Sequence, residues 1–141
     1  MATINPYLNF PGNTEDAFNF YKSVFGGEFS ALVRFKDTPN AENVTAAEKD
    51  KIMHVALPIG KGNLLMATDA LESTGEKLTV GNSMHVSLEA DSEEEATQLF
   101  NGLSAGGKVT VPLSKMFWNA YFGMFSDKFG VSWMVNYTFK Q

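Results

Sequence analysis

One succession of local signals occurs twice in this chain of 141 residues. In each half, a short strand-like run is followed by a helix-capping residue, an apolar stripe at helical spacing, a Gly-Gly pair and further strand-like runs. The capping residues Asn13 and Ser92 recur after about 80 residues, as do the pairs Gly26-Gly27 and Gly106-Gly107. Order, length and terminators agree between the halves, which predicts an internal duplication.

Capping and periodicity predict one helix in each half. Asn13 can accept a backbone N–H of the first turn, and Ser92 with Glu95 forms a capping-box pattern. Apolar stripes at i, i+3, i+4 and i+7 follow, namely Ala17, Phe20, Tyr21 and Val24 in the first half and Ala96, Leu99, Phe100 and Leu103 in the second. Each Gly-Gly pair then ends its helix, because glycine adopts the left-handed conformation of a C-cap.

Runs rich in β-forming residues and bounded by turn residues predict the strands. They cover residues 4–10, 28–35, 51–59 and 63–68 in the first half, and 84–90, 109–113, 117–125 and 131–139 in the second. Residues 36–50 are polar and predict a long loop with one helical turn at 45–49. A loop of that length is either a lid or binding loop or a surface insertion, and both interpretations stay open.

These elements predict an α+β fold. We expect a single domain, residues 1–141, made of two paired βαβββ modules, residues 1–72 and 82–141. Each module presents a sheet with a helix on one face only, so its other face must be buried or must enclose something. We expect two curved mixed sheets to turn these open faces toward a shared cleft, where small ligands usually bind.

Composition excludes several classes of function. The net charge is −5 and the 11 Lys and Arg residues are scattered, which argues against nucleic acid as a partner. The absence of cysteine excludes disulfides, thiolate metal sites and cysteine nucleophiles. Residues 1–6 do not form a signal-peptide pattern, and no apolar run approaches the ~20 residues of a membrane helix. We therefore expect a cytoplasmic protein without a membrane partner.

Six stretches spread over nearly the whole chain form family motifs. They are PYLNF at 6–10, EDAFNFY at 15–21, FGG at 25–27, MHVAL at 53–57, LMATD at 65–69, and a run from FW at 117–118 through FG at 122–123 and DKFGV at 127–131 to WMVN at 133–136. In these motifs the chain resembles the PhnB-like branch of the vicinal oxygen chelate superfamily, which includes glyoxalase I, extradiol dioxygenases and bleomycin-binding proteins. The resemblance implies paired βαβββ modules, a homodimer and, in many members, a divalent metal held by His and Glu.

The chain has two histidines, His54 in a predicted strand of the first half and His85 at the start of a strand in the second. Two histidines and a carboxylate are the smallest facial set for a catalytic divalent ion. The resemblance to glyoxalase-type members implies that His54 and His85 occupy the second and third ligand positions. A metal-free histidine in a cleft, able to act as a general base, is the alternative.

The other two ligand positions implied by the resemblance hold unsuitable residues. Pro6 has no donor side chain, and Met134 offers a soft thioether that matches hard divalent ions poorly. Asp69 and Asp127 are the nearest carboxylates in the sequence, but both read as turn or strand-end residues. The sequence therefore predicts no certain cofactor and leaves a divalent ion (Zn, Fe, Ni or Mn) as an open alternative.

Aromatic and methionine side chains are candidates for a pocket wall. Most aromatic residues are buried for packing, but strand parity sends some of them toward the cleft. The predicted pocket residues are Phe35, Met53, Met66, Asp69, Trp118, Phe122 and Met134. Phe35 begins the long loop, and Trp118 is expected on a strand of the second module.

Two functions follow from these residues. The incomplete ligand set favours a protein that binds a small apolar or aromatic molecule in a cleft between the modules without a complete metal site. The alternative is a divalent-metal-dependent lyase or dioxygenase that uses His54 and His85. The sequence leaves open whether the protein is an enzyme, because function must be argued from a site and this site is incomplete.

Overall fold

A computed structural model describes residues 2–39, 41–75 and 77–140 of the chain. The chain divides into two compact units, residues 1–79 and 80–141. The division falls inside the polar connection between the predicted modules. Each unit is described by itself below.

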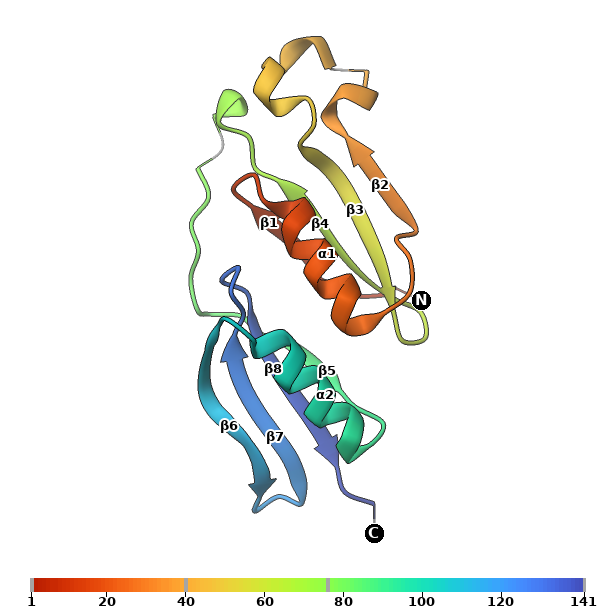
Figure 1. Cartoon of the computed structure of the whole chain (residues 1–141), viewed down its shortest axis with the longest axis vertical. Coiled ribbons are helices and arrows are strands. Elements are labelled where there is room, and N and C mark those ends of the chain that lie inside the picture. Colours follow the sequence, from red (N-terminus) through yellow and green to blue (C-terminus); the bar gives the residue numbers. More distant parts are fainter. Residues whose placement is uncertain (1, 40, 76, 141) are drawn as a thin grey trace. The chain divides into compact units, whose positions relative to one another are not determined.

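The first unit is one four-stranded sheet with one long helix. Its elements are β1 (Tyr7–Phe10), α1 (Thr14–Phe25), β2 (Ala31–Arg34), β3 (Ile52–Ile59) and β4 (Asn63–Asp69) (Figure 1). The strand order is β1-β4-β3-β2, with β1 parallel to β4 and the other neighbours antiparallel. This first sheet is therefore mixed.

The second unit repeats the topology of the first. Its elements are β5 (Val86–Glu89), α2 (Glu93–Ser104), β6 (Lys108–Met116), β7 (Ala120–Ser126) and β8 (Ser132–Thr138) (Figure 1). The strand order is β5-β8-β7-β6, and again only the first strand runs parallel to its neighbour. Two βαβββ units with one topology confirm the predicted α+β fold and its paired modules.

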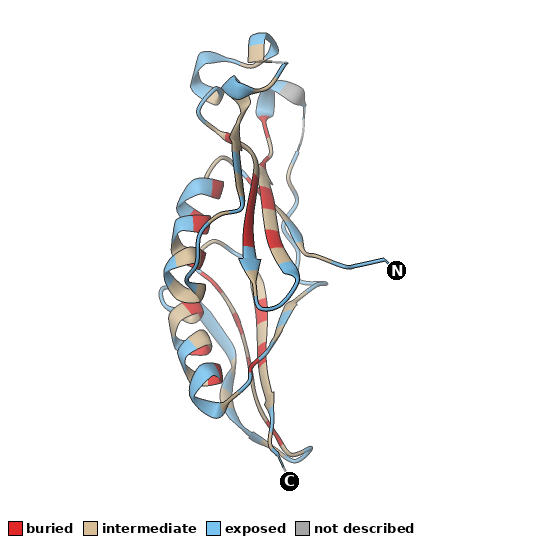
Figure 2. Ribbon diagram, turned by 90° about the vertical axis from the view of Figure 1, so that its right-hand side faces the viewer, coloured by how far each residue is buried: buried red, intermediate tan, exposed pale blue. Residues whose placement is uncertain are grey.

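Each helix buries one stripe against its own sheet, and Figure 2 shows these buried positions on the strand-facing side. On α1 the stripe consists of Thr14, Ala17, Phe18 and Tyr21. The predicted residues Ala17 and Tyr21 are buried, but Phe20 and Val24 are only half-buried, because the buried repeat begins one turn earlier, at Thr14. On α2 the buried residues are Ala96, Phe100 and Leu103, as predicted apart from the half-buried Leu99.

Glycine at one position of β7 lets α2 approach its sheet. A Cβ atom added at Gly123 would lie 2.5 Å from Cε2 of Phe100 and 3.0 Å from the backbone of Leu113. The Phe100 ring instead packs edge-on against Phe125, with centroids 5.1 Å apart. Any side chain at Gly123 would therefore push the helix away from the sheet.

The long loop of the first unit consists of short helical turns, η1 (Phe35–Asp37), η2 (Ala41–Asn43) and η3 (Ala46–Glu48). The turn predicted at 45–49 is confirmed by η3, which Thr45 and Glu48 cap reciprocally. A fourth turn, η4 (Glu72–Thr74), follows β4. Asn40, which is part of the predicted loop, lies outside the described residues. In the part of the chain that the structure describes, no helix combines the length and apolar character needed to span a membrane.

Two strand predictions in the second unit were wrong at their shared boundary. The strand predicted at 109–113 extends to Met116, and the one predicted at 117–125 begins only at Ala120. Phe117 and Trp118 form the turn between β6 and β7, and Asn119 has a positive φ of 62°. Apolar composition suggested a strand here, but the backbone reverses direction at these residues.

Candidate functional site

A β-bulge in β3 sets the direction of His54. Val33 pairs with His54, but the next residue, Arg34, pairs with Ile52, so Met53 is an extra residue on β3. Arg34 forms an ion pair with Glu15 of α1 at 2.6 Å, and Ile52 is buried, so this pair faces the helix. In a regular strand, residues two positions apart, such as Ile52 and His54, share a face, but the bulge at Met53 places these two on opposite faces. His54 therefore lies on the opposite face.

We call that opposite surface the open face of the first sheet. Strand alternation and register place on it Tyr7 and Asn9 of β1, Met66 and Thr68 of β4, His54 and Ala56 of β3, and Ala31 and Val33 of β2. The helix-facing side carries the buried Val55, Leu57, Leu65 and Ala67. Most open-face neighbours of His54 are apolar, and the ring itself is half-buried.

Tyr7 and His54 form a close pair on the open face. The Tyr7 hydroxyl lies 3.1 Å from Nδ1 of His54, and the two rings are nearly parallel, with centroids 5.8 Å apart and an interplanar angle of 22°. The residues come from β1 and β3, which β4 separates. Burial raises the pKa of the Tyr7 phenol above its ordinary value of 10.0, because burial disfavours the phenolate.

Sequence reasoning missed Tyr7 as a partner of His54. The contact follows from the parallel register of β1 against β4, in which Tyr7 lies beside Met66. That register depends on pairing between segments almost 60 residues apart, which periodicity does not reveal.

Asp69 belongs to the helix-facing side of the first sheet. Its Oδ1 accepts hydrogen bonds from the backbone N–H of Thr14 at 3.0 Å and from the Thr14 hydroxyl at 2.6 Å. Its Oδ2 accepts the backbone N–H of Ile52 at 2.8 Å. The residue is only 3% exposed. Asp69 thus ends β4, as predicted, and ties β3 to the start of α1 instead of facing the open side.

Asp69 also supplies the hydrogen-bond acceptor at the start of α1 that the sequence predicted at Asn13. Asn13 occupies the N-cap position of α1, but among the residues that the structure describes its side chain makes no capping hydrogen bond, and its buried Oδ1 has no partner there. The predicted capping role of Asn13 was wrong because a carboxylate from the neighbouring strand end supplies the acceptor. Ser92 does cap α2, with its hydroxyl accepting the backbone N–H of Glu95 at 3.0 Å.

Asp127 is also buried and bonded. Its Oδ1 accepts the backbone N–H groups of Phe129 at 2.8 Å and Val131 at 3.0 Å, and its Oδ2 accepts the indole N–H of Trp133 at 2.8 Å. The carboxylate closes the turn between β7 and β8 and fixes the largest buried side chain of the second unit. Like Asp69, it has a complete structural role.

The residues within each unit do not fit a catalytic divalent ion. Nδ1 of His54 is bonded to Tyr7, and both candidate carboxylates are bonded elsewhere. Over residues 2–39, 41–75 and 77–140, no three His, Asp or Glu side chains are grouped so as to hold a metal. Pro6 precedes β1 and uses its carbonyl oxygen to accept the Met66 N–H at 3.2 Å. His85 is half-buried just before β5, in the second unit, so its convergence with His54 stays a prediction.

The second sheet also has an open face. Gly123, Phe125, Trp133 and Val135 face α2, so Phe122 and Met134, two predicted pocket residues, lie on the other side. The Trp118 ring packs against Phe122 from the turn, with centroids 5.7 Å apart, and is 49% exposed. In the first unit, Phe35 begins η1, Met53 forms the bulge, and Met66 lies on the open face. Whether these residues line one pocket stays a prediction.

A carboxylate that the sequence analysis missed lies on the open face of the second sheet. Glu89 of β5 pairs in register with Asn136 of β8. The Asn136 amide donates to Glu89 Oε2 at 2.7 Å, and the Thr138 hydroxyl donates to Oε1 at 3.3 Å. The sequence could have indicated this cluster, because Met134, Asn136 and Thr138 are alternate residues of β8 and therefore share a face of the sheet.

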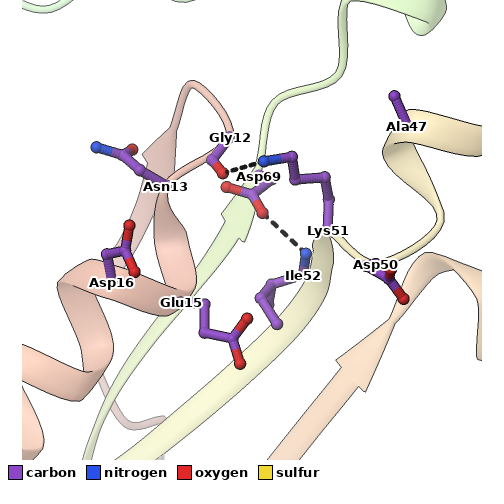
Figure 3. A pocket seen from close by; sticks show the side chains of 9 residues that line it. All are labelled: Gly12, Asn13, Glu15, Asp16, Ala47, Asp50, Lys51, Ile52 and Asp69. Atoms are coloured by element: carbon purple, nitrogen blue, oxygen red, sulfur yellow. Dashed lines mark hydrogen bonds between the residues drawn. The ribbon is translucent and has the colours of Figure 1, made fainter.

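A polar hollow of about 210 Å³ lies at the start of α1 (Figure 3). In it, the Lys51 ammonium donates to the Gly12 carbonyl at 2.8 Å, and Asp69 accepts from Ile52. Two carboxylates at the hollow are paired with cations, Glu15 with Arg34 and Asp50 with Lys36. These bonds hold the loop, strand and helix together, so the hollow is a structural junction.

Comparison with known proteins identifies the family. Residues 3–135 match the model of the Glyoxalase/Bleomycin resistance protein/Dioxygenase superfamily. The chain is 33% identical to protein YjdN of Escherichia coli strain K12 over 141 residues, which cover 94% of this chain and 93% of YjdN.

Two solved structures agree in fold and sequence. Protein PA1353 from Pseudomonas aeruginosa is 43% identical, with a TM-score of 0.85 and 98% of each chain covered. The PhnB protein from Bacillus cereus is 26% identical, with a TM-score of 0.76, 97% of this chain covered and 100% of that one. The chain therefore belongs to the glyoxalase/bleomycin resistance protein/dioxygenase superfamily, in its PhnB-like branch.

Proposed function

We propose that this protein binds a small apolar or aromatic molecule on the open face of its first sheet, with His54 as the polar contact. The observation that carries the proposal is the half-buried imidazole among Val33, Ala56 and Met66, on a sheet face that its own helix does not cover. Ligand sites in proteins are typically apolar surfaces with a few placed polar groups.

The availability of His54 supports the proposal. Among the described residues, its ring makes one hydrogen bond, to Tyr7 through Nδ1, and this leaves Nε2 for a ligand. Asp69, on the other side of the same sheet, has all its contacts to the protein itself. A polar group with a spare hydrogen-bonding position on an uncovered face is the one that can recognise a ligand.

A metal is not required for this binding. The incomplete ligand set at Pro6 and Met134 and the bonded carboxylates Asp69 and Asp127 support a metal-free site. The alternative function, a lyase or dioxygenase with a divalent ion on His54 and His85, needs a set of donors that the described residues of neither unit group together by themselves.

Binding is tested by a thermal-shift screen of planar apolar compounds, such as naphthalene derivatives, against the wild type, His54→Ala and the matched control His85→Ala. We expect at least one compound to raise the melting temperature of the wild type and of His85→Ala, with a smaller shift for His54→Ala. The absence of any shift at millimolar ligand would contradict the proposal. Equal shifts in all three proteins would contradict the role of His54.

Metal content separates the two functions. Protein purified without chelator should hold no stoichiometric divalent metal, and added divalent ions should leave its melting temperature unchanged. Stoichiometric zinc, iron, nickel or manganese that is lost in His54→Ala would overturn the metal-free site in favour of the metal-dependent enzyme.

We also propose that the protein is a homodimer, as the family resemblance implies. Light scattering coupled to size-exclusion chromatography at micromolar concentration should give twice the mass of the chain. A single-chain mass across that concentration range would contradict the dimer.

A further inference from the structure

We propose that Tyr7 fixes the tautomer of His54, so that Nε2 carries the proton and the site selects ligands with an oxygen hydrogen-bond acceptor on an apolar frame. The part that concerns the ligand rests on the proposed function. The part that concerns the tautomer is a property of the protein alone. Tyr7 acts here as a positioning residue, because it works through His54.

In the hydrogen bond between Tyr7 and His54, the Tyr7 hydroxyl is the donor. The distance of 3.1 Å between the Tyr7 hydroxyl and Nδ1 of His54 allows either group to donate. A phenol keeps its proton at neutral pH and can donate it to an acceptor within reach. Among the described residues, Nδ1 of His54 is the only hydrogen-bond partner of the Tyr7 hydroxyl. An imidazole nitrogen is also a stronger acceptor than a phenol oxygen, so Tyr7 donates.

The hydrogen bond at Nδ1 decides where the proton of the neutral His54 ring lies. A neutral imidazole carries one proton, and an Nδ1 that accepts leaves that proton on Nε2. The near-parallel stacking of the two rings restricts the rotation of the imidazole, so the direction of the Nε2–H bond is also restricted. A hydrogen bond made by one ring nitrogen in this way assigns the role of the other.

A proton on Nε2 makes the site selective among ligands. An Nε2–H donor on a largely apolar surface is satisfied by a carbonyl, ether or oxyanion oxygen of a ligand. A pure hydrocarbon would bury the donor without a partner, which is unfavourable. A ligand group that can only donate hydrogen bonds, such as an ammonium, also leaves the Nε2–H donor without an acceptor. Discrimination arises because a buried polar group is left unpaired by the wrong ligand.

The tautomer is tested by long-range ¹⁵N–¹H NMR of the histidine side chains in the full-length protein, above the pH at which imidazole is protonated. In the wild type we expect His54 to show a single tautomer protonated at Nε2. In Tyr7→Phe, which keeps the ring and its stacking, His54 should move toward the mixture found in water. His85 serves as the internal control. A wild-type His54 protonated at Nδ1, or a His54 spectrum unchanged by Tyr7→Phe, would overturn the proposal.

The ligand class is tested with a pair of compounds of the same shape, 2-acetylnaphthalene and 2-isopropenylnaphthalene, which differ by C=O in place of C=CH₂. We expect the ketone to bind the wild type about tenfold more tightly, the factor that one hydrogen bond of ~1.4 kcal/mol provides. The preference should disappear in His54→Phe. Equal affinities for the wild type would overturn the ligand class but leave the proposed function intact.

Failure of both compounds to bind would overturn the proposed function, and with it the ligand half of this proposal. The NMR experiment still decides the tautomer in that case, because it needs no ligand. Should Tyr7→Phe fail to fold, the wild-type spectrum alone distinguishes a proton on Nε2 from one on Nδ1.

Discussion

Polar side chains on the two sides of the first sheet differ in how many of their hydrogen-bonding positions the protein itself occupies. On the helix-facing side, Asp69 accepts three hydrogen bonds from Thr14 and Ile52 and is buried. On the open side, His54 uses one ring nitrogen for Tyr7 and keeps the other available, while its partner Tyr7 is 43% exposed. Both residues were candidate metal ligands in the sequence, but the hydrogen-bonding positions of Asp69 are occupied and those of His54 are not all occupied.

The difference separates polar groups whose hydrogen-bonding positions are all occupied from polar groups that keep a spare position. A buried group whose bonding positions are occupied by its own protein stabilises the fold and is unavailable to a ligand. A group with a spare position on an uncovered face adds little to stability and can bind something else. Substitutions should therefore lower stability strongly on the helix-facing side and weakly on the open side.

The largest expected effect is that of Asp69→Ala. Removing the carboxylate leaves two backbone N–H groups and the Thr14 hydroxyl without their acceptor, at a cost of ~3 kcal/mol in the free energy of unfolding. Urea denaturation measures the loss, and Asp69→Asn, which keeps one acceptor oxygen, should lose less. A change below ~1 kcal/mol for the alanine variant would break the contrast between the two sides.

Asp127→Ala extends the comparison to the second unit, with an expected loss of ~2 kcal/mol. Its carboxylate serves the N–H groups of Phe129 and Val131 and the indole of Trp133. The emission of the buried Trp133 should report the change, and Trp118→Phe provides a background in which it is the only tryptophan. Stability equal to that of the wild type would show that the turn does not need the carboxylate.

Ser92→Ala removes the local cap of α2 and should cost ~1 kcal/mol, because one backbone N–H at the helix start loses its acceptor. Ser92→Asp is the matched control and should retain most of the stability, since aspartate also caps. Thermal or urea denaturation measures both variants. An equal loss in the two would point to a role of Ser92 other than capping.

A still smaller effect is expected at the ion pair between Glu15 and Arg34. The hydrogen bond from Arg34 lowers the pKa of Glu15 below its ordinary value of 4.5. The folded-state pKa is below the unfolded one, so the stabilisation is present above pH 4.5 and is lost as the pH falls through the folded-state value.

The pair is partly exposed, and solvent screening limits its contribution to ~0.5 kcal/mol. Glu15→Gln should therefore lower stability by that amount at pH 7 and low salt. As the pH falls below 4.5, the difference from the wild type should shrink. A difference that does not change with pH would assign the effect of the substitution to packing and not to charge.

The smallest effect on stability is expected for His54→Ala, below ~0.5 kcal/mol, although the same substitution should weaken ligand binding. Urea denaturation measures the first quantity and the thermal-shift screen the second. A loss as large as that of Asp69→Ala would show that His54 is a structural residue, and the two sides of the sheet would then be alike.

The fold could be predicted because its signals are local and occur twice. Caps, stripes and glycine pairs lie within single elements, so the helices and most strands follow from neighbouring residues. Ser92 and Glu95 are three residues apart, and their capping bond was correctly predicted. The cap of α1 could not be, because its acceptor, Asp69, is 55 residues from Thr14 and reaches it only through the parallel pairing of β1 with β4.

The candidate site was only partly predictable, because its contacts join residues that lie far apart in the sequence. His54 stood out because histidine is rare in the chain, but its orientation depends on the bulge at Met53, which appears only in the pairing of β2 with β3. Tyr7 was not recognised, because its contact with His54 crosses β4. Trp118 was assigned to a strand from its apolar neighbours, although the chain turns there.

We expect a ligand to bind on the open face of the first sheet and not in the polar hollow on the other side. Intermolecular NOEs between bound 2-acetylnaphthalene and the full-length protein distinguish the two places. NOEs to the His54 ring and to the Met66 methyl group are expected. NOEs to Ala47 and Ile52, which line the hollow, would contradict this expectation.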